Sequence, residues 1–179
     1  MRRSGRLGKW VMALALVCCA LPVGAQAFNP PPVGSRSHGT RIGLFGFGLR
    51  FGADISGDGQ AILGGTLDLG SLAIDQLRLR PSVEIGILNG ANTYAGSFEL
   101  LYRFAPDKQA AIPYVGGGLA LAGHAECGSD PDCPGVWVNV VIGLEIRYRS
   151  TFNWLIEYHG MDAFSHNRLY LGLTTRRGS

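Results

Sequence analysis

The chain has few charged residues and almost no lysine. Only 16% of its 179 residues are charged, and two are lysine, Lys9 and Lys108. Beyond residue 27 the sequence has no apolar run of the length that a membrane-spanning helix requires, and no stretch with apolar residues spaced three and four apart over a helical length. These absences argue against a helical bundle and against a helical membrane protein.

The first 27 residues have the features of a secretory signal peptide. Four basic residues precede an apolar stretch from Trp10 to Val23, and Ala25-Gln26-Ala27 supplies small residues for cleavage, which we expect after Ala27. Removing this segment leaves twelve Lys and Arg against thirteen Asp and Glu, so a net charge of +3 becomes −1. The charge of the mature chain therefore gives no support to nucleic-acid binding.

The rest of the chain is dominated by apolar and polar residues in strict alternation. In residues 76–86 each Arg, Ser or Glu is followed by Leu, Pro, Val or Ile, and residues 136–148 repeat the pattern. Such period-two alternation predicts β-strands. We expect a Pro-rich linker at 28–39, a strand domain at 40–175 and a basic tail at 176–179, with strands near 42–53, 63–69, 76–86, 94–104, 113–123, 136–148, 152–159 and 168–174.

Short clusters of Gly, Asn, Asp, Ser and Pro separate these segments, for example 56–59, 89–92 and 105–108. Short connections force neighbouring strands to be antiparallel, because a parallel crossover needs a dozen or more residues. The sequence therefore predicts an all-β fold, an eight-stranded antiparallel up-and-down barrel (a meander). The connections near 54–60, 89–92, 124–135 and 160–166 are expected at the end opposite the N-terminus.

Alternation alone does not show which face meets water. A soluble lipocalin-like barrel is polar outside and apolar inside, whereas an outer-membrane barrel has the opposite arrangement. Aromatic residues on the apolar face, several near strand ends, favour a transmembrane β-barrel with aromatic girdles. The aromatics expected on the lipid face are Phe45, Phe51, Tyr94, Phe98, Tyr102, Phe104, Tyr148, Phe152, Trp154 and Tyr158.

The polar face combines glycines with charges that nearly cancel. Charges inside a narrow barrel must pair, and arginine forms the bidentate carboxylate contacts that make such pairing tolerable. We expect these side chains to fill the lumen of the barrel and to leave no diffusion pore. The expected lumen network is Arg50, Asp68, Arg78, Arg80, Glu84, Glu99, Arg103, Glu145, Arg147, Glu157 and Arg168.

Two stretches, Ile112-Pro113-Tyr114-Val115-Gly116-Gly117-Gly118-Leu119 and Leu101-Tyr102-Arg103-Phe104, resemble the small outer-membrane barrels of Gram-negative bacteria, the OmpA, OmpX and opacity-protein type. The resemblance extends over residues 40–175. It implies a non-enzymatic cell-envelope protein whose loops serve surface interaction or envelope stability. It also implies contact with outer-membrane lipid and lipopolysaccharide, insertion by the barrel assembly machinery and no cofactor, and we expect a monomer. One departure is that such barrels end their last strand in an aromatic, whereas here Leu173 stands near the end.

Cys127 and Cys133 are the cysteines that remain after processing, and both lie in the longest expected loop. In an exported protein this arrangement predicts a disulfide. The alternative is a metal site that joins the two thiols to His124, Glu126, Asp130 or Asp132. Because the spacing matches no standard zinc pattern, we expect the disulfide and no metal.

His159 and Glu157 lie two residues apart on the polar face, which suggests an enzymatic alternative. The segment Ile156-Glu157-Tyr158-His159-Gly160-Met161-Asp162-Ala163 resembles the histidine strand of outer-membrane lipid A deacylases, in which a serine two residues after the histidine is the nucleophile. Here that position is Met161, and the nearby serine is Ser165. We therefore expect no catalytic activity and assign His159 to the charged lumen.

Overall fold

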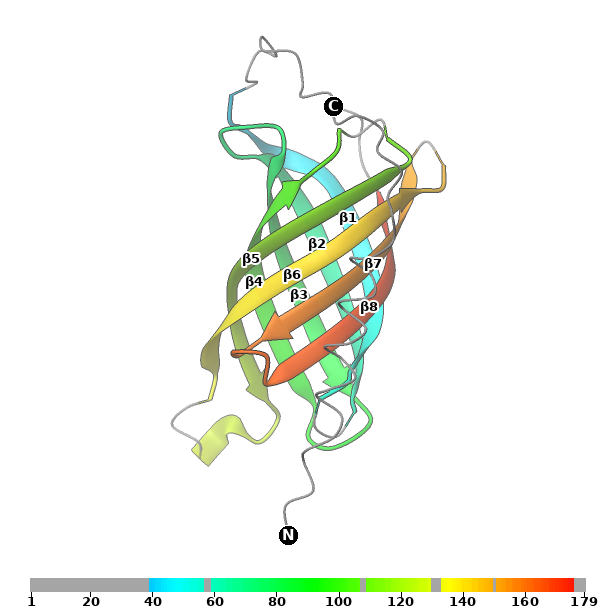
Figure 1. Ribbon diagram of the computed structural model, residues 1–179. Helices are drawn as coiled ribbons and strands as arrows, with labels where there is room; N and C mark the ends of the chain where they lie inside the picture. Colours follow the sequence, from blue (N-terminus) through cyan, green and yellow to red (C-terminus); the bar gives the residue numbers. More distant parts are fainter. Residues whose placement is uncertain (1–38, 57–58, 107–108, 130–132, 150, 176–179) are drawn as a thin grey trace. The chain divides into compact units, whose positions relative to one another are not determined.

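A computed structural model describes residues 39–56, 59–106, 109–129, 133–149 and 151–175. Within these ranges the chain forms eight β-strands and one short 3-10 helix, η1 (Cys127–Ser129). The signal peptide (1–27), most of the linker, Lys108 and the basic tail (176–179) lie outside the described residues. The strands are β1 (Arg41–Asp54), β2 (Ala61–Ser71), β3 (Leu77–Ile87), β4 (Thr93–Arg103), β5 (Ala111–His124), β6 (Gly135–Arg147), β7 (Phe152–Met161) and β8 (His166–Thr175) (Figure 1).

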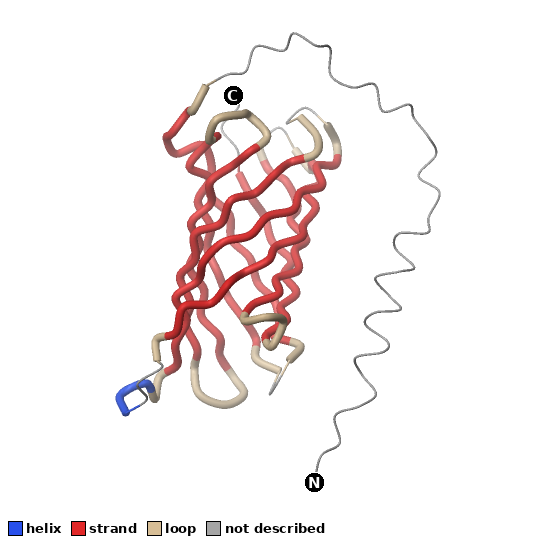
Figure 2. Tube along the Cα trace, turned by 60° about the vertical axis from the view of Figure 1, so that its left-hand side comes forward, coloured by secondary structure: helices blue, strands red, loops and turns tan. Residues whose placement is uncertain are grey.

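The strands form a closed barrel in sequence order. Each strand pairs antiparallel with the next, and β1 also pairs with β8, so that Gly48 faces Thr174 and Asp54 faces Arg168 along the closing seam. Figure 2 shows that the strands are tilted within the barrel wall that they form. Closure leaves none of the paired strands as an exposed sheet edge. The predicted all-β, eight-stranded antiparallel fold is confirmed.

Alternation divides the wall into an apolar outer surface and a polar interior. In β3, Arg80, Ser82 and Glu84 are buried, whereas Val83 and Ile85 between and beside them are exposed. The same contrast runs along the other strands, where exposed side chains are Leu, Ile, Val and aromatics and buried ones include Arg, Glu, Ser and Asn. A water-soluble barrel has the opposite arrangement, so this wall matches one that faces hydrocarbon.

The alternation is interrupted near the start of β1. The register with β2 shifts between Ile42 and Gly46, and on the partner strand Gly70 has a φ of 102°, a conformation that favours glycine. Phe45 lies inside this irregular stretch. Its ring is half-buried and its centroid is 5.4 Å from the guanidinium carbon of Arg78, so it does not lie on the outer surface as the alternation predicted.

The connections after β1, β3, β5 and β7 share one end of the barrel because the strands alternate in direction. They comprise residues 55–60, 88–92, 125–134 and 162–165, and each bound lies within two residues of the expected one. Asp54, which the sequence placed in a loop, is the last residue of β1 and is buried. Among the described residues, no helix is both long and apolar enough to cross a bilayer.

Candidate functional site: the charged barrel interior

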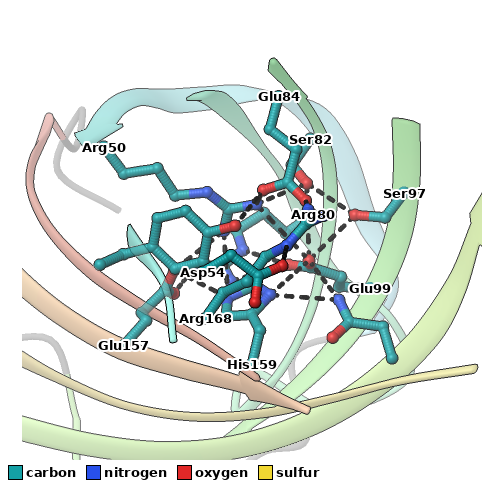
Figure 3. A network of polar contacts seen from close by, with 12 residues as sticks. Arg50, Asp54, Arg80, Ser82, Glu84, Ser97, Glu99, Glu157, His159 and Arg168 are labelled. Atoms are coloured by element: carbon teal, nitrogen blue, oxygen red, sulfur yellow. Dashed lines mark hydrogen bonds and ion pairs between the residues drawn. The ribbon is translucent and has the colours of Figure 1, made fainter. Parts of the chain in front are cut away.

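Charged side chains from most of the barrel wall meet in its interior. Arg50 comes from β1, Arg80 from β3, Glu99 from β4 and Glu157 from β7, and all four are at least nine-tenths buried. Figure 3 shows these side chains extending from different strands of the barrel toward one another in its interior. Period-two alternation explains the direction of each side chain, and barrel closure explains why residues far apart in sequence meet.

Glu157 lies at the centre of the network and contacts four groups. Its Oε2 accepts a hydrogen bond of 2.9 Å from Arg50 Nη1 and lies 3.2 Å from His159 Nε2. Its Oε1 accepts hydrogen bonds from Arg80 Nη1 and from the Tyr114 hydroxyl. A carboxylate with only 1% exposure needs such partners, because burial removes the water that would otherwise solvate its charge.

Arg50 joins Glu157 to a second carboxylate on β3. Its Nη2 donates to Ser82 Oγ at 2.9 Å and to Glu84 Oε2 at 3.3 Å, and its guanidinium carbon lies 4.6 Å from the centroid of the Tyr170 ring. The adjacent Gly64 provides the space, since a Cβ there would approach the Arg50 side chain to 3.2 Å. Arg50 therefore bridges β3 and β7 through the interior.

A third arginine closes the network toward the end of the barrel that carries the β1–β2 connection. Arg168 donates to Glu84 Oε1 at 2.5 Å and to Asp54 Oδ2 at 3.2 Å. Glu84 also accepts a 2.5 Å hydrogen bond from the Tyr170 hydroxyl, and Asp54 accepts from the Ser56 hydroxyl at 2.6 Å. Sequence reasoning missed Asp54 because a strand end and a polar turn look alike in the sequence.

Neutral polar groups complete the central cluster. Ser97 Oγ lies 2.6 Å from Ser82 Oγ and donates to Glu99 Oε1 at 3.0 Å, while Asn139 Nδ2 donates to the same oxygen at 2.9 Å. Arg80 Nε donates to Glu99 Oε2 at 2.8 Å. The Ser and Asn residues were visible on the polar face of the sequence, but their roles depend on pairing that alternation does not specify.

Two further ion pairs lie beyond this cluster. Arg78 contacts Asp68 at 2.7 Å and Arg103 contacts Glu145 at 3.6 Å. A cavity of about 20 Å³ lies among these residues, which is room for one water molecule. Arg147, predicted to belong to the lumen network, is the last residue of β6 and is exposed, because the end of this strand extends beyond the packed interior.

A glycine on the inner wall positions Tyr114. A Cβ at Gly143 would collide with the outer atoms of the Tyr114 ring, so only glycine leaves room for the ring against the wall. The hydroxyl of the same tyrosine reaches Glu157. The alternation does not show which residues of the glycine-rich β5 point inward, because glycine is neither apolar nor charged. Tyr114, with 2% exposure, identifies the inner face of this strand.

His159 is fully buried and is held on both ring nitrogens. Nε2 lies 3.2 Å from both Arg50 Nη1 and Glu157 Oε2, and Nδ1 lies 3.3 Å from Asn139 Nδ2. Ser165, the nearby serine, lies in the exposed turn after β7, where its backbone N–H donates to Asp162. The structure therefore places His159 with Glu157 but places Ser165 outside the interior.

The aromatics expected on the lipid face lie on the outer surface with the exception of Phe45. Tyr158 is half-buried there, and its hydroxyl donates to Asn167 Oδ1 at 2.5 Å. Near the opposite end Tyr102 packs edge to face against Phe104, and Tyr148 against Trp154. The exposed members are Phe51, Tyr94, Phe98, Tyr102, Phe104, Tyr148, Phe152 and Trp154.

The predicted disulfide between Cys127 and Cys133 is present and closes part of the loop between β5 and β6. His124, at the end of β5, lies beside it, and one potential ligand atom from each of the three residues falls within 4.8 Å of the others. Glu126 is exposed in the same loop, and Asp130 and Asp132 lie outside the described residues.

No protein-family model matches the sequence, and no curated protein matches it. Solved structures do. The N-terminal β-barrel domain of Pseudomonas aeruginosa OprF superposes with a TM-score of 0.58 at 18% identity, covering 75% of this chain and 99% of that one. Neisserial surface protein A gives 0.56 at 14% identity, with 74% and 95% covered. A de novo designed transmembrane β-barrel gives 0.50 at 15% identity, with 78% and 99% covered.

These similarities concern the whole barrel and not a local motif. At such low identity they establish the fold and leave activity open. The chain has the fold of the small eight-stranded outer-membrane barrels, as the resemblance in its sequence implied.

Proposed function

We propose that the chain is a non-enzymatic outer-membrane protein of the Gram-negative cell envelope, exported through a cleaved signal peptide. The observation that carries this proposal is the pairing of an apolar outer wall with an interior of buried, paired charges. Val83 on the outer wall is 66% exposed, whereas Glu84, the next residue, is 6% exposed. A wall that exposes apolar side chains and buries charged ones is stable in lipid and would be costly in water.

The interior serves stability in this proposal and conducts no solutes. Eight strands leave an interior narrow enough for side chains to fill, and Arg50, Arg80 and Arg168 bind carboxylates from four different strands across the lumen. These contacts link opposite walls of the barrel. The lumen is therefore blocked by the groups that stabilise it.

The loops after β1, β3, β5 and β7 form the surface available for contact with other molecules. We assign this end to the cell exterior and the opposite end, where β1 begins, to the periplasm. The outer wall of the barrel then contacts lipid and lipopolysaccharide. We propose a monomer inserted by the barrel assembly machinery, without nucleic-acid partners or a cofactor.

The enzymatic alternative has less support. His159 has no exposed surface, Met161 occupies the position of the deacylase nucleophile, and Ser165 lies in an exposed turn. Mass spectrometry of lipid A from cells that express the protein tests this point. An unchanged acylation pattern is expected, and loss of an acyl chain that depends on His159 would establish the enzyme instead.

Fractionation of a Gram-negative host tests the location. The mature chain should begin after Ala27 and sediment with the outer membrane. A thiol-reactive, membrane-impermeant probe should label the Ala91→Cys variant in intact cells. The Ala73→Cys variant, changed in a turn at the opposite end, should be labelled only after lysis. Recovery in the soluble periplasmic fraction, or labelling with the reverse sidedness, would contradict the proposal.

A further inference from the structure

The loop after β5 brings a histidine and two cysteines together at the rim of the barrel. His124 is the last residue of β5, Cys127 begins η1 and Cys133 lies just before β6. Potential ligand atoms of all three lie within 4.8 Å of one another, and all three side chains are half-buried. The two sulfurs are joined as a disulfide in this structure. Once that bond is reduced, two thiolates and an imidazole form a donor set that suits Zn²⁺.

The surroundings of Cys127 favour a thiolate as well as a disulfide. The backbone N–H of His124 donates to Cys127 Sγ at 3.3 Å, and the Tyr94 hydroxyl lies 3.5 Å from the same sulfur. Hydrogen bonds to a ligand atom of this kind orient it and stabilise its charge when a metal binds. The sulfur would thus have partners in both oxidation states.

The position of Tyr94 is fixed by the barrel wall. Its Cα pairs with that of Gly123 across β4 and β5, and a Cβ on Gly123 would come within 2.6 Å of the phenol oxygen. The neighbouring pair, Thr93 with His124, is followed by a 2.8 Å backbone hydrogen bond from Ala125 to Asn92. His124 and Tyr94 are therefore held by strand pairing, so two elements of the site exist before any ligand binds.

We propose that this loop is a redox-controlled metal site. In the oxidised protein Cys127 and Cys133 form the disulfide and cannot bind metal. Two molecules of a small thiol reduce it: the Cys127–Cys133 S–S bond breaks, each cysteine sulfur gains a proton, and the two thiol molecules become one disulfide. Zn²⁺ then displaces both protons and binds the two thiolates and the imidazole of His124, with water in the fourth position.

Cobalt binding provides a direct test, because Co²⁺ in a tetrahedral site with thiolate ligands has intense visible and near-ultraviolet absorption. The detergent-folded mature protein is reduced, freed of reductant without oxygen and titrated with Co²⁺, followed by Zn²⁺. The expected result is a tetrahedral, thiolate-type spectrum that saturates at one equivalent and is removed by one equivalent of Zn²⁺. Oxidised protein should give no such spectrum.

Variants separate this site from adventitious binding. His124→Ala should weaken the affinity by at least about 10-fold, because loss of a ligand costs more than loss of an outer-shell partner, and Cys127→Ser should weaken the thiolate bands by removing one of two thiolates. His166→Ala, at the same end of the barrel, should change neither. Heat-dependent gel mobility of each variant shows whether the barrel has folded. An octahedral spectrum in the reduced protein, equal binding in the oxidised protein, or an unchanged affinity in folded His124→Ala would overturn the proposal.

Discussion

Arg50 Nη1 lies 2.9 Å from Glu157 Oε2, although 107 residues separate the two in the sequence. Arg50 is on β1 and Glu157 is on β7, so their contact spans the interior and skips β8, which joins β1 in the wall. Both side chains are at most 1% exposed. The pair therefore depends on barrel closure and also reinforces it.

Glu157→Gln should destabilise the barrel strongly, because it removes one charge that neutralises both Arg50 and Arg80. Removing one partner of a buried ion pair lowers the free energy of unfolding by about 3 to 5 kcal/mol, because the other charge stays buried without compensation. The free energy of unfolding in lipid vesicles, measured by urea titration, should fall by this amount. Glu126→Gln, the same change in an exposed loop, is the matched control, and equal stability of the two variants would contradict the role of the network.

Gly143→Ala should displace Tyr114 and break its hydrogen bond to Glu157, since the added Cβ would occupy the space of the ring. Overpacking of this kind costs about 1 to 3 kcal/mol. Gly96→Ala is the control because a Cβ there meets nothing within 4 Å. The same unfolding measurement should separate the two variants, and a Gly143→Ala barrel as stable as Gly96→Ala would show that Tyr114 does not need this glycine.

Val83→Arg tests the orientation of the wall. Val83 lies near the middle of β3 and is exposed, so the outer-membrane arrangement places an introduced charge in hydrocarbon at a cost of about 2 to 4 kcal/mol. Ile55→Arg, in the connection after β1, should be nearly neutral. Vesicle-based unfolding midpoints measure the difference, and a neutral Val83→Arg would favour a soluble barrel.

The folded protein should form no persistent channel in a planar lipid bilayer. In the proposed function buried charged side chains block the lumen, and the cavity of about 20 Å³ beside Asp68 and Arg103 has room for about one water molecule. Current recordings on the purified protein, with an open porin as the positive control, should show a baseline without steady steps. A stable conducting state would show that the interior is open.

The sequence predicted the fold well because alternation is a local property that the barrel preserves. Arg80, Glu84 and Glu99 could be assigned to one face from spacing alone, but the partners they bind depend on closure and on the relative stagger of the strands. Local irregularity also escaped prediction: the register shift near Phe45 turned an expected lipid-facing ring toward Arg78.

Residues at strand ends were the hardest to place. Asp54 looked like part of a turn and is instead a buried partner of Arg168, whereas Arg147 matched the alternation and is exposed where β6 ends. Periodicity defines which face a residue occupies and does not define how far the packed interior extends along the barrel.

The central claim, that this chain is a closed barrel with an apolar outer wall and a charged interior, is tested most directly by gel mobility in detergent. Protein extracted from the outer membrane should migrate at different positions in sodium dodecyl sulfate with and without boiling, because the closed barrel resists unfolding until heated. Glu157→Gln should lose this resistance at a lower temperature than the wild type. A protein that is released in soluble form and migrates identically before and after boiling would contradict the account.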